Sequence, residues 1–275
     1  MDPVLLLEKV FGADDSGYIP PRYINQLMKL SWSGYIPADG IRALCWRVLL
    51  GLISPSDKSL WESQLSDMIV EYNNIKAKVM PSLDKVEIDP LSAMSSGNAA
   101  HEEWSLYYKN VDLITFIKTD LERLYITGIP DEYFESKDRR DMLLGILVIW
   151  SFHHPVISYR QGMHEMAAYV MYVIETELRF WSVLSTENAE GKVRSDPYGL
   201  LHVLTEQNIE ANTYHIFARI MNELEPIYDP VAFTPRGAES QPFVVQFSTK
   251  VQGKYSTGTV IICILSVEVY KTIRI

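Results

Sequence analysis

Apolar side chains recur every three to four positions along most of the chain, which is the period of an α-helix. This pattern predicts helices over residues 41–50, 57–80, 113–126, 138–152, 163–177 and 206–225. Residues 142–150 are apolar on nearly every side, which is typical of a helix at the centre of a multi-helix assembly. Neither a strand–helix alternation nor a fixed-period repeat occurs. The predicted fold class is therefore all-α.

Residue types that favour caps and turns set the expected ends of these helices. Asp39 is placed to cap the first helix, and Gly51 to end it. Ser56 is placed to cap the second helix, which we expect to stop before Pro81. Two stretches rich in turn-forming residues, 81–103 and 191–197, are predicted to be loops.

The last part of the chain follows a different pattern. From about Gly253 it reads GKYSTGTVIICILSVEVYKTIRI, which is rich in β-branched residues and predicts a strand or hairpin. A strand-forming tail conflicts with the helical pattern before it. We therefore expect an atypical tail in place of the natural end of the helical domain.

Composition and charge narrow the class of protein. The chain has 275 residues, of which 47% are apolar and 22% charged, as in an ordinary soluble globular protein. Its 35 acidic and 25 basic residues give a net charge of -10, which disfavours binding to nucleic acid. The densest basic cluster, 137–140, is interrupted by Asp138.

Cysteine usage and hydropathy bear on the compartment. Cys45 and Cys263 lie far apart without a metal-ligand spacing, which fits a reducing compartment and argues against a disulfide framework or a zinc site. The longest apolar runs, 142–150 and 259–265, fall well short of the roughly 18 residues of a membrane span. We expect a cytoplasmic protein without a transmembrane segment or a signal peptide.

Three short motifs contain the candidate functional residues. In GYIPADGIRALCWRVLLG, Arg42 and Trp46 lie one turn apart on the same helix face. The simplest interpretation is a scaffold element, with Trp46 in the core and Arg42 paired nearby.

The second motif is IKTDLER, residues 117–123. Asp120 and Arg123 flank an apolar stripe of the predicted helix, and their spacing favours an ion pair of about 0.2–0.5 kcal/mol. Arg123 also falls in the last turn, where a cation suits the helix dipole. Spacing alone favours this structural role over a functional one. The stripe consists of Ile114, Ile117, Leu121 and Leu124.

The third motif is SYRQGMHE, residues 158–165, at the start of a predicted helix. Gln161, followed by Gly162, places an amide at the mouth of the helix with little bulk around it. Taken alone, such a glutamine is more often a surface residue or a helix cap. Signatures of common hydrolases, nucleotide-binding loops and zinc proteases are absent. The adjacent pairs His153–His154 and His164–Glu165 lack a spaced third ligand, which argues against a metalloenzyme.

In this order, the three motifs resemble the TBC domain of Rab GTPase-activating proteins, over residues 31–230. That family pairs R-x-x-x-W-x-x-L-L-G with I-x-x-D-x-x-R and Y-x-Q. A later segment, 209–221, also resembles a family helix, with Asn212 where Asp is usual. Three features are similar to the family member linked to endosomal retromer trafficking: residues 88–92, Trp104 and the QGMHE sequence. In that sequence, His164 stands where Asn is commoner. The matching residues are Arg42, Trp46, Leu49, Leu50 and Gly51; Ile117, Asp120 and Arg123; and Tyr159, Gln161, Gly162 and Met163.

The resemblance implies a GTPase activator that supplies catalytic residues in trans and is not itself a GTPase. Arg123 is the expected arginine finger on the β/γ-phosphates, and Gln161 the expected glutamine finger that orients the attacking water. Asp120 is expected to hold Arg123, and Tyr159 to shape the glutamine loop. GTP and Mg²⁺ belong to the partner Rab, so no cofactor of this chain is expected.

The implied organisation is an N-terminal extension over 1–30, an incomplete TBC domain over 31–242 and the atypical tail over 243–275. Further expected properties are a retromer-type coat as a second partner and peripheral recruitment to endosomal membranes for vesicle trafficking. Two alternatives remain at this point. One is a non-catalytic Rab- or coat-binding helical scaffold, and the other is a purely structural domain whose motifs are idle.

Overall fold

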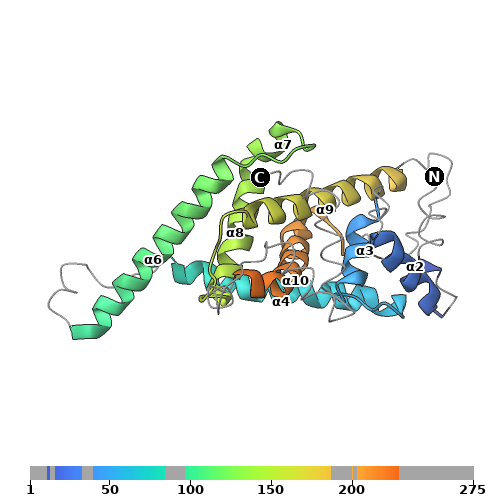
Figure 1. Ribbon diagram of the computed structural model, residues 1–275, viewed down its shortest axis with the longest axis horizontal. Helices are drawn as coiled ribbons and strands as arrows, with labels where there is room; N and C mark the ends of the chain where they lie inside the picture. Colours follow the sequence, from blue (N-terminus) through green and yellow to red (C-terminus); the bar gives the residue numbers. More distant parts are fainter. Residues whose placement is uncertain are drawn as a thin grey trace, which may run out of the picture. The chain divides into compact units, whose positions relative to one another are not determined.

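The computed structural model describes residues 11–12, 16–32, 40–83, 97–186, 200 and 203–228, and within these ranges the chain is helical without a β-strand. This confirms the all-α prediction (Figure 1). The strand-like tail, the loop over 191–197 and residues 88–92 lie outside the described residues. The helices are α2 (Pro21–Trp32), α3 (Arg42–Leu49), α4 (Trp61–Leu83), α6 (Gly97–Glu122), α7 (Asp131–Glu135), α8 (Lys137–His153), α9 (Met163–Thr186) and α10 (Ile209–Tyr228), with short 3₁₀ turns η1 (Lys58–Leu60) and η2 (Glu206–Asn208).

The chain forms two compact units, one from Met1–Ile69 with Tyr169–Ile275 and the other from Val70–Ala168. Helices α4 and α9 contribute residues to both units. No helix in the described part of the chain is both long and apolar enough to cross a membrane.

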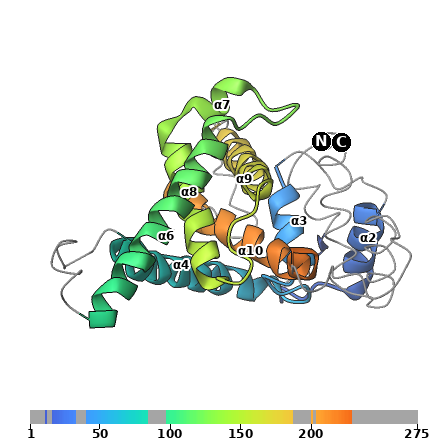
Figure 2. The same cartoon turned by 60° about the vertical axis from the view of Figure 1, so that its left-hand side comes forward.

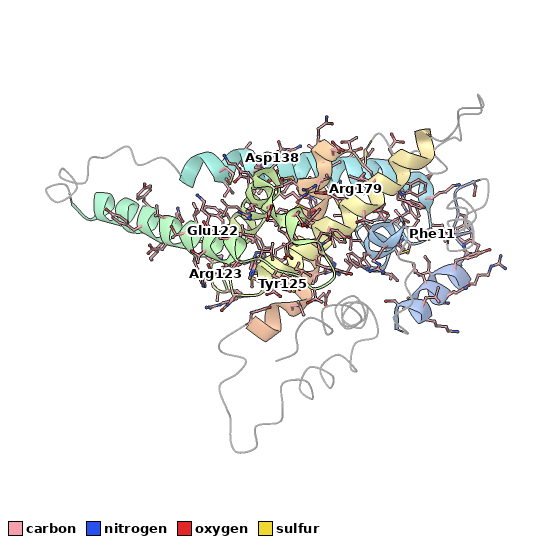
Figure 3. All side chains as sticks on the ribbon, turned by 90° about the horizontal axis from the view of Figure 1, so that it is seen from above. Phe11, Glu122, Arg123, Tyr125, Asp138 and Arg179 are labelled. Carbon is pink, nitrogen blue, oxygen red and sulfur yellow. The ribbon has the colours of Figure 1, made fainter. Side chains whose placement is uncertain are left out.

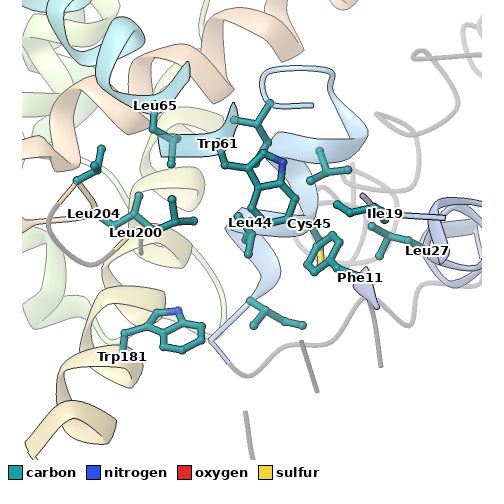
Figure 4. Packing of buried hydrophobic residues seen from close by; sticks show 14 residues of the cluster. Phe11, Ile19, Leu27, Leu44, Cys45, Trp61, Leu65, Trp181, Leu200 and Leu204 are labelled. Carbon is teal, nitrogen blue, oxygen red and sulfur yellow. The ribbon is translucent and has the colours of Figure 1, made fainter. Parts of the chain in front are cut away.

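The first unit is built on a core around Trp61 (Figure 4). The ring of Phe11 meets the edge of Trp61 at a centroid distance of 5.2 Å, and the indole Nε1 donates to the carbonyl of Ser54. Phe11 and Leu27 belong to the segment expected to be an extension, yet both are buried in this core, and residue 30 falls inside α2. Cys45 is also buried here, and burial raises the pKa of its thiol, which therefore stays protonated.

The prediction for the C-terminal end of α3 is confirmed. Gly51 ends the helix as expected: its φ is +71°, its N–H donates to Val48 at 3.1 Å, and the N–H of Leu52 donates to Arg47 at 2.9 Å. Both hydrogen bonds are those of a Schellman motif, which needs a left-handed residue after the helix. The N-cap of the helix is Ile41, whose side chain makes no cap hydrogen bond. Asp39 itself lies outside the described residues.

The next helix begins at a different cap from the predicted one. Asp57 accepts from the backbone N–H of Ser59 at 2.9 Å and is the N-cap of η1, which leads into α4. Ser56, the predicted cap, makes no such bond to the turn. The helix continues through Pro81 to Leu83, so the predicted stop before Pro81 was wrong.

The second unit is organised by α6 and α8, which pack side by side (Figure 2). Ile117 and Leu121 of the predicted stripe are buried, and α8 has the predicted position. Helix α6 begins at Gly97, however, so the predicted loop over 81–103 was wrong at both ends. It also ends at Glu122, before the predicted limit of 126. Helix α9 starts at Met163 as expected and continues nine residues beyond 177.

Candidate functional site

Arg123 is the first residue after α6, in the second unit (Figure 3). Its backbone N–H donates to Asp120 at 3.2 Å, which closes a tight final turn. The side chain is exposed, and it forms no hydrogen bond or ion pair with any residue in the described ranges. The ion pair with Asp120 that the spacing predicts is therefore absent. Among the described residues, the guanidinium of Arg123 therefore has no partner, and it lies directly after the end of α6.

Gln161 lies in the segment that joins α8 to α9, also in the second unit. Within this segment, two residues with left-handed backbone conformation lie on either side of Gln161: Ser158 with φ +53° and Gly162 with φ +95°. A non-glycine residue rarely adopts positive φ, so the conformation at Ser158 carries strain that the surrounding contacts must hold. Buried Tyr159 and Met163 anchor the segment on both sides of Gln161, whose own side chain is exposed.

A hydrogen bond joins the arginine-bearing helix to the glutamine-bearing segment. The hydroxyl of Tyr159 donates to Asp120 Oδ2 at 2.6 Å, and the phenol oxygen lies 2.7 Å from His164 Nδ1. Tyr159 is 4% exposed, and Phe116 of α6 meets its ring edge-on at 5.4 Å. Asp120 is three residues before Arg123, and Tyr159 is two residues before Gln161. The two candidate catalytic residues therefore extend from two segments that a side-chain hydrogen bond joins.

Burial governs the protonation of this cluster. Burial, reinforced by the hydrogen bond to Asp120, raises the pKa of the Tyr159 phenol. Burial lowers the pKa of His164 from its ordinary value of about 6.5, although the charge of Asp120 acts in the opposite direction. Burial and the charge of Asp120 both raise the pKa of Glu165. At neutral pH the phenol is thus protonated and the imidazole is neutral.

The sequence identified the members of this cluster but paired them wrongly. Asp120 was expected to hold Arg123, whereas its carboxylate accepts from Tyr159 instead. His164 was dismissed as a metal ligand and was otherwise noted only as standing where the family more often has Asn. An aromatic hydroxyl 39 residues away from a carboxylate leaves no signal in local spacing, so only the fold could reveal this contact.

Arg42 and Trp46 lie in the first unit and have the predicted scaffold role. Arg42 Nη1 donates to the hydroxyl of Tyr169 at 3.0 Å, and the Trp46 ring lies 6.1 Å from the ring of the same tyrosine. Trp46 is 2% exposed. Arg42 and Trp46 therefore both contact the same tyrosine of α9, Tyr169.

A buried polar network in the first unit was missed by the sequence analysis. Arg47 is 1% exposed and pairs with Glu177 at 3.2 Å, while its other terminal nitrogen donates to Asn212 Oδ1 at 3.2 Å. Glu177 also accepts from the backbone N–H of Leu44 at 3.0 Å. Burial raises the pKa of Glu177, and the charge of Arg47 opposes this effect. An arginine within the apolar run 43–48 was the available signal.

Asn212 has a clear local reason to differ from the family's usual aspartate. Its amide nitrogen donates to the carbonyl of Asn208 at 2.9 Å, while its oxygen accepts from Arg47. The network therefore contains one buried cation and one buried anion. An aspartate would add a second buried negative charge, which is costly without a further partner.

Metal-binding clusters are not a feature of the described ranges, where no three His, Cys, Asp or Glu side chains gather closely enough to hold an ion. His153 and His154 instead mark the end of α8. The Nδ1 atom of each lies within hydrogen-bonding distance of a backbone carbonyl one turn earlier.

The solved structure of the Ypt/Rab-GAP domain of Gyp1p has a similar fold. The alignment covers 98% of this chain and 77% of that chain, with a TM-score of 0.56 and 16% sequence identity. At this identity the likeness supports the fold alone.

Curated relatives include TBC1 domain family member 5 homolog B of Dictyostelium discoideum, which is 27% identical over 209 residues, 74% of this chain and 19% of that protein. The human TBC1 domain family member 5 is 24% identical over 217 residues, 76% of this chain and 25% of that protein. The chain thus spans between a fifth and a quarter of the length of these relatives. Residues 39–186, more than half of the chain, match the Rab-GTPase-TBC domain, and this range includes residues 42–51 of the first motif and all of the second and third motifs. The chain therefore belongs to the Rab-GTPase-TBC domain family.

Proposed function

We propose that this protein is a GTPase-activating protein for a Rab-family small GTPase, and that it acts in trans through Arg123 and Gln161. The observation that supports this most directly is that the Tyr159–Asp120 hydrogen bond joins two segments, one ending in an exposed arginine and the other carrying an exposed glutamine. Neither side chain has a partner among the described residues. A structural arginine has partners within its own chain. Arg123 has none among the described residues, so its charge is available to another molecule.

The chemistry of each side chain suits its proposed task. Charge builds on the phosphoryl oxygens during GTP hydrolysis, and a permanently charged, planar guanidinium stabilises it through two hydrogen bonds. The amide of Gln161 both donates and accepts, so it can orient the attacking water without changing charge. GTP and Mg²⁺ are held by the Rab, and this chain needs no cofactor of its own.

The backbone that carries Arg123 and Gln161 is held in place before the Rab binds. Arg123 follows a helix whose last turns are buried against α8, and Gln161 follows a tyrosine that is itself buried and hydrogen-bonded. With the backbone held in this way, only the two exposed side chains have to be ordered in the transition state, which favours catalysis.

Single-turnover GTP hydrolysis by a panel of purified Rabs tests the proposal. The wild-type chain is expected to accelerate at least one Rab, and Arg123→Ala to remove that acceleration while Rab binding persists. Lys118→Ala is the matched control, because it removes an exposed cation from the same helix. Equal acceleration by wild type and Arg123→Ala would refute the arginine assignment.

The glutamine assignment needs its own comparison. Gln161→Ala is expected to lower the hydrolysis rate strongly, whereas Gln207→Ala, which removes an exposed glutamine from η2, is expected to have no effect. If Rabs bind the wild-type chain but none is accelerated, the protein is a non-catalytic binding scaffold instead.

We place this activity in endosomal trafficking, at cytoplasmic membranes to which the chain is recruited peripherally, with a retromer-type coat as a second partner. Similarity to the TBC1 domain family member 5 proteins and the QGMHE segment supports this placement. Calorimetric titration of the chain with purified retromer tests it. Measurable binding is the expected result, and no binding at high micromolar concentration would remove the coat from the proposal.

A further inference from the structure

The hydroxyl of Tyr159 holds one proton and has two neighbours, and this fixes the donors and acceptors around it. The carboxylate of Asp120 has no proton to give, so Tyr159 donates to Oδ2 at 2.6 Å. The phenol oxygen must then accept at 2.7 Å from His164 Nδ1, which carries the imidazole proton. His164 is thus the donor that completes a three-residue chain from α9 through Tyr159 to α6.

The other face of the imidazole meets a second carboxylate. His164 Nε2 lies 4.0 Å from Glu165 Oε1, and Nδ1 lies 3.8 Å from Asp120 Oδ2. In the neutral ring Nε2 has no proton and faces a negative charge. The titratable groups facing His164 in the described part of the chain are therefore Asp120 from α6, Tyr159 from the joining segment and Glu165 from α9 itself.

We propose that His164 is a positioning residue for GTPase activation, which holds Tyr159 against Asp120 and so fixes Gln161 relative to Arg123. The proposal rests on the function proposed above and names a residue that does not touch the nucleotide. The imidazole acts through the Tyr159 hydroxyl. Its Nδ1–H donates a hydrogen bond to the buried phenol oxygen, which already donates its own proton to Asp120.

Protonation changes this arrangement. An imidazolium attracts Asp120 Oδ2, already 3.8 Å away, in competition with Tyr159, and its new Nε2–H points toward Glu165. The first effect competes directly with the Tyr159–Asp120 hydrogen bond, and the second draws the ring toward Glu165, so both disturb the hydrogen-bonded chain through Tyr159. Rab activation is therefore expected to fall as His164 gains a proton. Burial lowers its pKa below about 6.5, so this fall lies on the acid side of that value.

Three variants separate positioning from mere stability. His164→Leu removes the donor, and we expect kcat for Rab activation to fall by about tenfold with KM little changed, since misplacement of about 1 Å costs up to about 100-fold. His164→Asn keeps an N–H donor at the same branch and is expected to lose much less than His164→Leu. His153→Leu, an exposed histidine at the end of α8, is the matched control.

The pH profile is the readout that a structural role alone would not change. Activation by wild type, divided by the intrinsic Rab rate at each pH, is expected to decline from pH 7.5 toward 5.5, while His164→Asn stays flatter. Identical profiles for the two proteins, or a full rate for His164→Leu, overturn the inference. Absence of any acceleration by wild type is a different result, because it removes the proposed function itself.

A spectroscopic measurement closes the test. In ¹⁵N-resolved NMR of the wild-type chain, the His164 signal, assigned by its loss in His164→Asn, is expected to show the proton on Nδ1 near pH 7.5. A proton on Nε2, or a pKa of His164 at or above the ordinary value of about 6.5, contradicts the proton assignment and with it the inference.

Discussion

Arg47 and Arg123 are used in opposite ways by the two units of this protein. Arg47 in the first unit is buried, forms an ion pair with Glu177 and donates a hydrogen bond to Asn212, so its guanidinium is not available to another molecule. Arg123 in the second unit is exposed and has no partner among the described residues. An arginine whose guanidinium is hydrogen-bonded within the fold stabilises its own chain. An exposed arginine without partners is available to another molecule.

The largest expected effect is on activity, at Arg123. Arg123→Ala is expected to lower Rab activation by about 10³-fold or more, because related GTPases gain that much from such an arginine. Its melting temperature should match wild type, since an exposed side chain without partners contributes little to stability. Parallel hydrolysis and thermal unfolding measurements check this. A clear loss of stability would mean that Arg123 is structural after all.

Arg47 should show the reverse pattern. Arg47→Ala leaves Glu177 buried without its cation, which is expected to cost about 3–5 kcal/mol of unfolding free energy. Urea unfolding measures the loss. Arg179→Ala is the control, because the Arg179–Glu175 pair has a largely exposed arginine and is expected to contribute less than about 1 kcal/mol. Similar losses for both variants would show that burial does not separate them.

Two glycines of the second unit separate site geometry from stability. Gly162 and Gly128 have φ of +95° and +90°, and a Cβ at either would meet nothing within 4 Å. Alanine at either position is therefore expected to cost about 1–2 kcal/mol through backbone strain alone. Only Gly162→Ala, next to Gln161, should also reduce Rab activation. Equal rates for the two variants would remove Gly162 from the site.

The smallest expected effect is on stability, and it separates Asp57, the observed cap of η1, from Ser56, the cap that the sequence predicted. Asp57→Ala is expected to cost about 1 kcal/mol, because Asp57 accepts from the backbone N–H of Ser59. Ser56→Ala is expected to stay within about 0.5 kcal/mol, as an exposed residue outside the cap. Chemical denaturation of both variants decides the matter, and a larger loss at Ser56 would reverse the assignment.

The sequence predicted the parts of the fold that depend on local periodicity. The positions of α8 and of the start of α9 follow from strong apolar patterns, and Gly51 follows from the demand for a left-handed residue after α3. It failed where local preferences compete. The cap moved from Ser56 to Asp57, and α6 began at Gly97 although glycine and asparagine favour a turn there.

The candidate site shows the same division. Motif spacing brought out Arg123 and Gln161, but the role of Asp120 depends on Tyr159, a residue brought next to it only by folding. The network of Arg47, Glu177 and Asn212 likewise joins three helices distant in sequence. Local patterns identify residue types, whereas their partners are set by tertiary packing.

The central claim is that Arg123 and Gln161 act together on the transition state of a nucleotide held by a Rab. The most direct measurement is the affinity of the chain for a Rab loaded with GDP and aluminium fluoride, compared with GDP alone. Because transition-state analogues bind at least about 100-fold more tightly than ground states, wild type and Lys118→Ala should show a strong preference for the fluoride complex. Arg123→Ala and Gln161→Ala should lose it. A preference that survives both substitutions would contradict the account.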